Sequence, residues 1–167
     1  MKHDIKKLMK LARKILREGP IQDIGCVLGV EDEVAIAIRE AVFDVCSIFS
    51  IKRCRSDDVN IKTLRRARGK SESWIVRAIV RMFFVREVRE LVWRVKGLPE
   101  LGDMYDEYLV TFSKDKKRYV CSCFSHGRVE WRRRRQKEIC THIAAVILYR
   151  RVLKKVNVKL PSFFNVE

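Results

Sequence analysis

The N-terminal half of the chain has the apolar spacing of amphipathic helices. From residue 3 to residue 17, apolar side chains recur every three or four positions, and lysines and arginines occupy the opposite face. Gly19-Pro20 ends this pattern, because neither residue continues a helix well. A second helical pattern covers about residues 32–50. These helices would suit a bundle or a dimer interface equally well, so the pattern assigns them no role.

Two more helices are expected before the pattern changes. One covers about residues 57–68, and a glycine ends it. The other begins near Glu72, where the hydroxyl of Ser71 or Ser73 can accept a hydrogen bond from a backbone N–H group of the first turn. The four segments predict a helical region over residues 1–87.

Beyond this region the apolar period shortens to two residues, which is typical of strands. Alternation over residues 88–95 predicts one strand, and a loop with glycines and a proline follows it. Residues 108–112 and 119–121 predict a hairpin, because they alternate on either side of a charged turn at 114–117. A last, apolar helix is expected over about residues 141–155.

These elements predict an α+β protein. A helical region over residues 1–87 would support a small domain of strands and one helix over 88–156, and residues 157–167 would form a tail. A chain of 167 residues suits one domain, or two very small ones that share a core.

The charge of the chain narrows the class of partner. Hydrophobic residues make up 47% of the sequence and charged ones 35%, which is ordinary for a folded protein. The net charge of +16 is large for 19.7 kDa and favours a polyanionic partner. Nucleic acid is the commonest such partner. An anionic membrane surface and a merely soluble basic protein are the alternatives.

The first residues of the chain and its amino-acid composition indicate the cellular compartment and the source of the protein. No apolar segment follows the charged first residues, and no apolar stretch is long enough to span a bilayer, so we expect a cytoplasmic protein. The low content of glutamine and asparagine, with abundant charged and branched residues, is typical of hyperthermophiles and suggests an archaeal source. Six cysteines in such a protein favour metal ligands or buried thiols before disulfides.

Four residues have the spacing of a metal site. Cys121-x-Cys123 comes at the end of a predicted strand, and Cys140-x-His142 opens the last predicted helix after 16 intervening residues. Three thiolates and one neutral imidazole form a complete tetrahedral set for zinc, so one structural and non-catalytic Zn²⁺ is expected. The alternative is that these residues are buried thiols and a core histidine.

The segment from Tyr108 to Leu153 resembles the SWIM zinc finger. That family has a β-β-α layout in which a C-x-C pair, a variable insert and a C-x-H pair precede an apolar helix. The run His142-Ile143-Ala144-Ala145-Val146 is close to the family's usual H-I-x-A-V. The resemblance covers about 46 of 167 residues, and the remainder resembles no family. It implies a zinc-bound fold of the kind associated with DNA binding and with protein–protein contacts.

The other metal-ligating residue types are weaker candidates. His126 lies between the two ligand pairs and is a conceivable substitute ligand. Cys26, Cys46 and Cys54 lack ligand spacing and are expected to be buried thiols, with a Cys46–Cys54 link or a second metal as the alternatives.

A basic segment surrounds the predicted zinc site. Between residues 114 and 155 there are fourteen Lys or Arg and three Asp or Glu. Guanidinium groups bind phosphates, and an aromatic ring can stack on a base. The residues expected to contact nucleic acid are therefore Lys116, Lys117, Arg128, Trp131, Arg132, Arg133, Arg134 and Arg135. The alternative is a solvated loop that only keeps the domain soluble.

Several other patterns in the sequence bear on function. Residues 24–30 resemble the first helix and turn of a helix-turn-helix, but the acidic run at 31–33 would face phosphates with the wrong sign. Asp103, Asp106 and Glu107 could serve a magnesium-dependent nuclease, although a solvated acidic loop is the preferred interpretation. Further residues that look like core are Trp74, Phe83, Phe84 and Trp93.

The sequence therefore predicts a non-catalytic zinc protein that binds nucleic acid, DNA or RNA, through its basic segment. The sequence contains no nucleophile elbow, zinc-protease helix, phosphate-binding loop or dinucleotide motif, so we expect neither an enzyme nor a small-molecule substrate. Because no apolar stretch could span a bilayer, we expect no membrane role either. The alternative is a protein–protein adaptor, such as an accessory factor of DNA recombination or repair.

Overall fold

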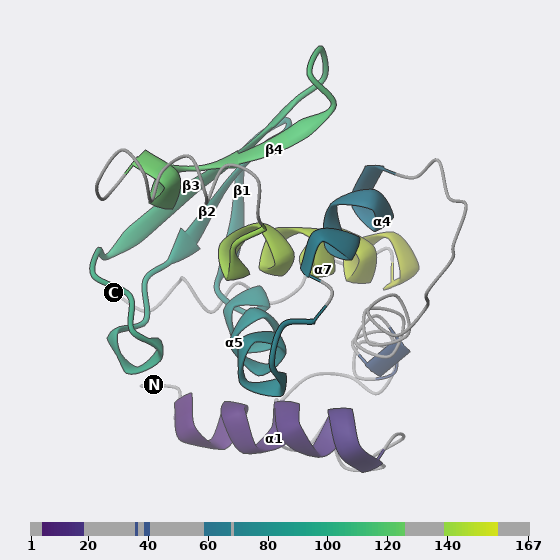
Figure 1. The fold of residues 1–167 in the computed structure, drawn as a ribbon, viewed down its shortest axis with the longest axis vertical. Coiled ribbons are helices and arrows are strands. Elements are labelled where there is room, and N and C mark those ends of the chain that lie inside the picture. The colour runs from purple at the N-terminus through teal and green to yellow at the C-terminus, as the bar shows by residue number, and fades with distance from the viewer. Residues whose placement is uncertain are drawn as a thin grey trace.

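The computed structural model describes residues 5–18, 36, 39–40, 59–67, 69–125 and 139–156. These residues form an α+β fold with four α-helices and a four-stranded antiparallel sheet (Figure 1). In chain order the elements are α1 (Ile5–Glu18), α4 (Val59–Leu64), the 3₁₀ turn η1 (Arg65–Ala67), α5 (Glu72–Met82), β1 (Val85–Arg89), β2 (Val92–Lys96), η2 (Pro99–Leu101), β3 (Glu107–Ser113), β4 (Arg118–Cys121), η3 (Ser122–Ser125) and α7 (Thr141–Val156).

The sheet has the order β1-β2-β3-β4, so each strand pairs with its neighbour in the chain. Alternate residues along β2, β3 and β4 are buried, as expected for a sheet with one covered face. The buried positions are Trp93, Val95, Tyr108, Val110, Tyr119 and Cys121. Between these positions, Leu109 and Val120 face away from the core and are exposed, whereas Arg94 is half-buried.

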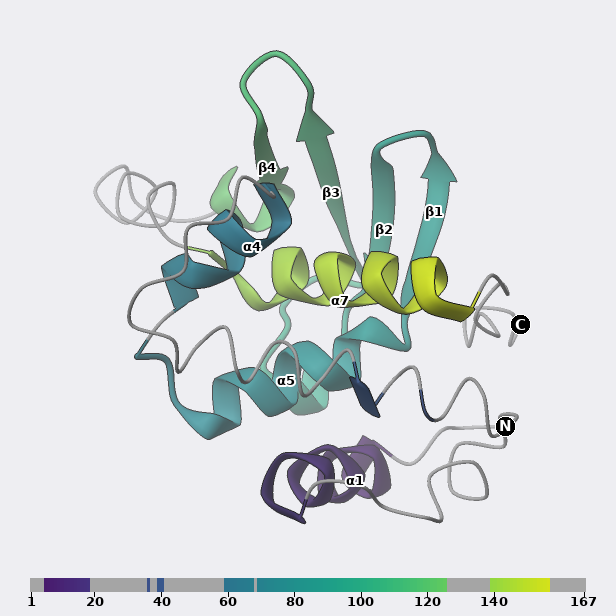
Figure 2. The same ribbon diagram turned by 90° about the vertical axis from the view of Figure 1, so that its right-hand side faces the viewer.

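Helix α7 covers the inner face of the sheet, and α5 packs on α7 from the other side (Figure 2). Six consecutive residues of α7, from Ile143 to Leu148, each have exposed fractions of 2% or less. A helix that is apolar on all sides needs cover on all sides, and the sheet and α5 supply it. Helix α1 packs in turn on α5 (Figure 1).

The predicted helices that fall on described residues are confirmed. Helix α1 matches the predicted segment 3–17, α4 with η1 matches 57–68, and α7 matches 141–155. Helix α5 begins at Glu72, and the Ser71 hydroxyl accepts a hydrogen bond from the backbone N–H of Trp74 at 3.4 Å. The aromatic residues expected in the core are buried there. The segments 32–50 and 157–167 lie almost wholly outside the described residues.

The single strand predicted over residues 88–95 is wrong. The chain forms the hairpin of β1 and β2, with register Val85 to Val95 and a tight turn at Leu91, whose φ is 61°. Leucine rarely adopts this left-handed conformation. The sequence therefore has no typical turn residue at this position to indicate that the chain reverses direction. The domain boundary predicted between residues 87 and 88 falls inside β1.

The loop from β2 to β3 is held by a close backbone contact. The Gly97 N–H donates to the Asp106 carbonyl at 2.6 Å, and a Cβ on Gly97 would lie 1.8 Å from the Tyr105 carbonyl oxygen. Only glycine permits this approach. Gly102 then takes a left-handed conformation with φ of 84° and ends η2. These two glycines place Asp103 beside the start of α7.

None of the helices that the structure describes is long and apolar enough to cross a lipid bilayer.

Candidate metal centre

Three elements meet at one end of the sheet and bring the four predicted ligands together. Cys121 ends β4, Cys123 lies in η3, Cys140 directly precedes α7 and His142 lies in its first turn. The candidate ligand atoms of these four residues all lie within 4.8 Å of one another. Cys121 and His142 are buried, whereas Cys123 and Cys140 are half-buried. This set can hold a metal ion.

The two imidazole nitrogens of His142 have different surroundings. Nε2 lies 3.2 Å from Oδ1 of Asp103, so this nitrogen is placed to donate to the carboxylate. Nδ1 is buried and has no hydrogen-bond partner. A buried polar atom without a partner is costly unless something binds it. Nδ1 is therefore the atom that fits a metal, and the Nε2–H tautomer is the one that the carboxylate favours.

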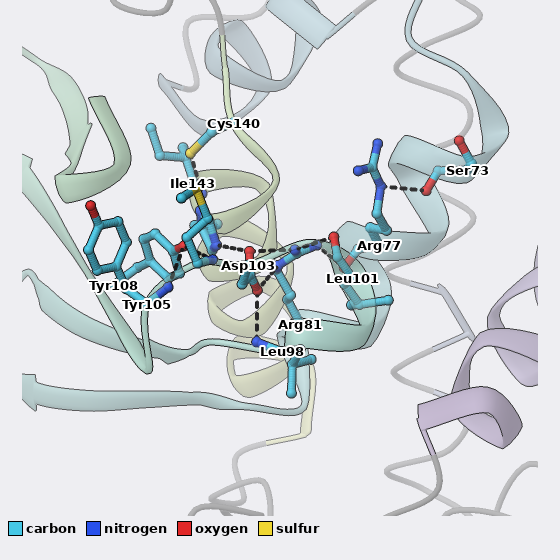
Figure 3. Close-up of polar contacts among 12 residues, drawn as sticks. Ser73, Arg77, Arg81, Leu98, Leu101, Asp103, Tyr105, Tyr108, Cys140 and Ile143 are labelled. Carbon is cyan, nitrogen blue, oxygen red and sulfur yellow. Dashed lines mark hydrogen bonds and ion pairs between the residues drawn. The ribbon is translucent and has the colours of Figure 1, made fainter. Parts of the chain in front are cut away.

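Asp103 is the centre of a buried polar network (Figure 3). Its carboxylate accepts hydrogen bonds from Arg81 Nη2 at 2.7 Å and Nε at 3.1 Å, and from the Leu98 N–H at 2.9 Å. Arg81 also donates to the Leu101 carbonyl. The side chains of Arg81 and Asp103 are 3% and 5% exposed. The prediction that Asp103 belongs to a solvated acidic loop is wrong, because Gly97 and Gly102 fold this loop inward.

The electrostatics of the network favour a charged Asp103. Burial raises the pKa of its carboxyl group, but the hydrogen bonds from His142 and Arg81 and from the Leu98 N–H outweigh burial and hold this pKa well below its usual value. Burial likewise lowers the pKa of His142, but the Asp103 carboxylate and the nearby Cys140 thiolate outweigh it and raise this pKa overall.

The pKa of each buried thiol depends on the hydrogen bonds that it makes with the other thiols. Hydrogen bonds to Cys123 and Cys140 raise the pKa of Cys121. Burial raises the pKa of Cys140, but hydrogen bonds from Cys121 and Cys123 and the nearby His142 imidazole outweigh it and hold this pKa well below its ordinary value. One thiolate is thus stabilised by protons on its neighbours. A bound cation would replace those protons.

The donor set fits a tetrahedral cation. Two thiolates on a zinc ion lie about 3.8 Å apart when each Zn–S bond is about 2.3 Å. The 4.8 Å limit on the distances among the four ligand atoms requires only a small contraction to reach that geometry. Four protein ligands would leave no open coordination position.

Tyr108 supports the histidine from the sheet side. Its ring stacks on the His142 imidazole with centroids 3.9 Å apart and planes at 20°. Its hydroxyl accepts a hydrogen bond from the Met104 N–H at 3.1 Å, which ties the loop to β3. Sequence reasoning missed Arg81, Asp103 and Tyr108 as parts of the site. Arg81 gave one usable signal, because a charged residue on the apolar side of a helix requires a buried partner.

The predicted nucleic-acid residues are only partly described. Lys116 and Lys117 are exposed in the turn between β3 and β4. The others lie outside the described residues: Arg128, Trp131, Arg132, Arg133, Arg134 and Arg135. The same holds for His126, for Cys26, Cys46 and Cys54, and for the helix-turn-helix candidate at 24–30.

Comparisons with protein-family models, with curated proteins and with solved structures find no match to this chain. The site therefore has to be interpreted from its own geometry and chemistry.

Proposed function

We propose that this chain is a SWIM-type zinc protein that binds nucleic acid and performs no catalysis. The observation that carries the zinc proposal is the convergence of three thiols and the unpartnered, buried Nδ1 of His142. Thiolate and imidazole ligands in a closed set of four are typical of structural zinc. The β3–β4 hairpin followed by α7 has the β-β-α order that the resemblance implies.

Zinc in this position would act as a clamp. It would join the end of β4 and η3 to the start of α7 across a connection of 16 residues between Cys123 and Cys140. The contacts along α7 then extend this link to the whole sheet and to α5. Metal binding would therefore contribute to folding.

Charge supports the nucleic-acid part of the proposal. The net charge is +16, and α1 alone carries six Lys or Arg against one Glu. The lysines of α1 are exposed, as are Lys116 and Lys117 on the hairpin that projects from the sheet (Figure 1). Phosphate contacts of this kind give binding that weakens steeply with salt and reads little sequence.

Metal content tests the first part of the proposal. Elemental mass spectrometry of the purified protein should find one zinc per chain. The variant Cys140→Ser with His142→Ala should lose it, whereas the control Thr141→Ala, which changes the residue between the two ligands, should retain it. A folded protein that contains no zinc would refute the zinc assignment.

Salt-dependent binding tests the second part. A labelled oligonucleotide should bind at low salt, and the logarithm of affinity should fall linearly with the logarithm of salt concentration. Replacing Arg132 to Arg135 with glutamine should weaken binding and make this slope shallower. Binding that is undiminished at low salt in the glutamine variant would refute the assignment to the arginine run.

A protein–protein adaptor is the second candidate. The outer face of the sheet exposes Leu109 of β3 by 43% and Val120 of the neighbouring strand β4 by 42%, and apolar side chains exposed on one face favour protein contacts. A partner that is retained at high salt, with negligible nucleic-acid affinity, would favour this alternative. Replacing Leu109 and Val120 with serine should then release the partner.

A further inference from the structure

A pocket of about 310 Å³ opens directly beside the candidate metal centre. Its inner wall includes Cys123, Cys140 and His142. The opposite wall is α5, and the rim is the loop that follows η2. This volume is at the small end of the range for ligand sites, so it suits one small molecule or one unit of a polymer.

One stripe of the α5 segment supplies the basic wall of the pocket. Trp74, Arg77 and Arg81 of α5 follow one another at intervals of three and four residues, which places them on one face of the helix. Lys70 lies just before the helix and also lines the pocket. Arg81 is the innermost, and its charge is matched by Asp103. Lys70 and Arg77 extend the positive charge toward the outside. Among the described residues that line the pocket, Asp103 is the only one with a carboxylate.

The Arg77 side chain is directed along α5 toward Ser73. Its Nε donates to the Ser73 carbonyl at 3.3 Å, which leaves the terminal nitrogens of the guanidinium oriented toward the same end of the helix as Lys70. Figure 3 shows Arg77 on the opposite side of the Asp103–Arg81 pair from Tyr105 and Tyr108. The pocket thus has a cationic side and an aromatic side.

Tyr105 and Met104 form the exposed rim, and Tyr105 supplies its aromatic ring. Tyr105 is 45% exposed and Met104 is 87% exposed, although both are large. Tyr105 meets Tyr108 edge to face with ring centroids 6.1 Å apart, and Tyr108 stacks on His142. An exposed ring fixed by a buried ring is a ready surface for stacking a flat, unpaired base.

The charge of the inner wall indicates how a ligand would lie. With the proposed zinc bound, three thiolates around a dication would leave one net negative charge, so a phosphate would avoid that end of the pocket. Lys70 and Arg77 would attract it to the outer end. A base inside a duplex cannot enter a pocket of this size, whereas an unstacked base of a single strand can.

We propose that this pocket binds one nucleotide of a single-stranded nucleic acid, with its phosphate between Lys70 and Arg77 and its base against Tyr105. The inference rests on the nucleic-acid-binding function proposed above. It adds a defined contact point and a preference for single strands to a binding mode that would otherwise depend on charge alone.

Fluorescence anisotropy with a single strand of about ten nucleotides tests the inference at fixed low salt. Tyr105→Ala and the pair Lys70→Ala with Arg77→Ala should each bind at least about tenfold more weakly. Tyr105→Phe keeps the ring and should bind as the wild type does. Arg89→Ala removes an exposed charge from β1, away from the pocket, and is the matched control. Zinc content and thermal unfolding should show that every variant is folded.

The outcomes separate this inference from the function on which it rests. No binding of any oligonucleotide by the wild type would overturn both. Binding that the pocket variants retain would overturn the pocket alone, and so would equal affinity for the matching duplex. Inorganic phosphate that competes as well as a mononucleotide would show a simple anion site and overturn the role of Tyr105. Loss of affinity in the pocket variants, with Tyr105→Phe and Arg89→Ala unchanged, would support the proposal.

Discussion

Helices α5 and α7 are held together in two chemically different ways. Along most of their length the contact is apolar, between buried residues such as Ile79 and Ile147. At the end that contains the candidate metal centre, the contact is a polar chain, in which Arg81 of α5 binds Asp103 and Asp103 binds His142 of α7. One helix pair thus contains an apolar region and a polar region.

Substitutions in the two regions should reduce the stability of the protein in different ways. An apolar core loses stability in proportion to the atoms removed, because each contact is small and non-directional. A buried network fails as a unit, because removing one member leaves another charge or donor without a partner. Substitutions in the two regions can therefore measure how large this difference is.

Removing the metal should have the largest effect. Binding energies for structural zinc in small finger peptides are about 10–16 kcal/mol at neutral pH. A chelator in excess should therefore lower the midpoint of thermal unfolding strongly in the wild type. Ile147→Val should cost about 0.5–1.5 kcal/mol both with and without chelator. If the chelator leaves the wild-type midpoint unchanged, the polar region does not depend on a metal.

Arg81→Met should be the most destabilising single substitution in the polar region. It leaves Asp103 buried without its cationic partner, and breaking a buried pair in this way costs about 3–5 kcal/mol. Ile79→Val on the same helix should cost about 0.5–1.5 kcal/mol. Denaturant unfolding of both variants measures the two losses in free energy of unfolding and gives their ratio. Equal losses would mean that the two regions contribute to stability in the same way.

The apolar region is also the part that the sequence predicts well. The helical spacing of α1 and α5 and the unbroken apolar run of α7 identify their buried residues, because burial follows directly from periodicity. The four candidate ligands are also found from the sequence, since the spacing within each pair is local. The approach of the two pairs is then confirmed by the structure.

The polar region could not be predicted, because its members are joined by backbone geometry and not by spacing. Arg81 and Asp103 are 22 residues apart, and their contact depends on a loop that Gly97 permits. The β1–β2 hairpin was missed for a related reason, since Leu91 occupies a turn position that seldom holds leucine. Such contacts depend on tertiary structure and leave no periodic signal.

Asp103→Asn tests whether the network serves the metal. The amide keeps the shape but removes the charge that orients His142 and matches Arg81. Loss of such a carboxylate typically weakens metal binding by about 10-fold to 100-fold. Competition with a coloured chelator measures this affinity. Asp106→Asn, at an exposed position in the same loop, should bind metal as the wild type does.

The pH dependence of that defect is the finest test. Asp103 raises the pKa of His142, so in the wild type a proton competes with the metal for Nδ1 to a higher pH than for an ordinary histidine. Asp103→Asn removes this effect and lowers the pKa of His142. The defect in metal affinity should therefore be largest at alkaline pH, where both proteins have a neutral imidazole, and should shrink as the pH falls through the pKa of the wild-type histidine. Chelator competition at several pH values measures this, and a defect that does not change with pH would mean that Asp103 acts on the metal centre by packing and not through the proton on His142.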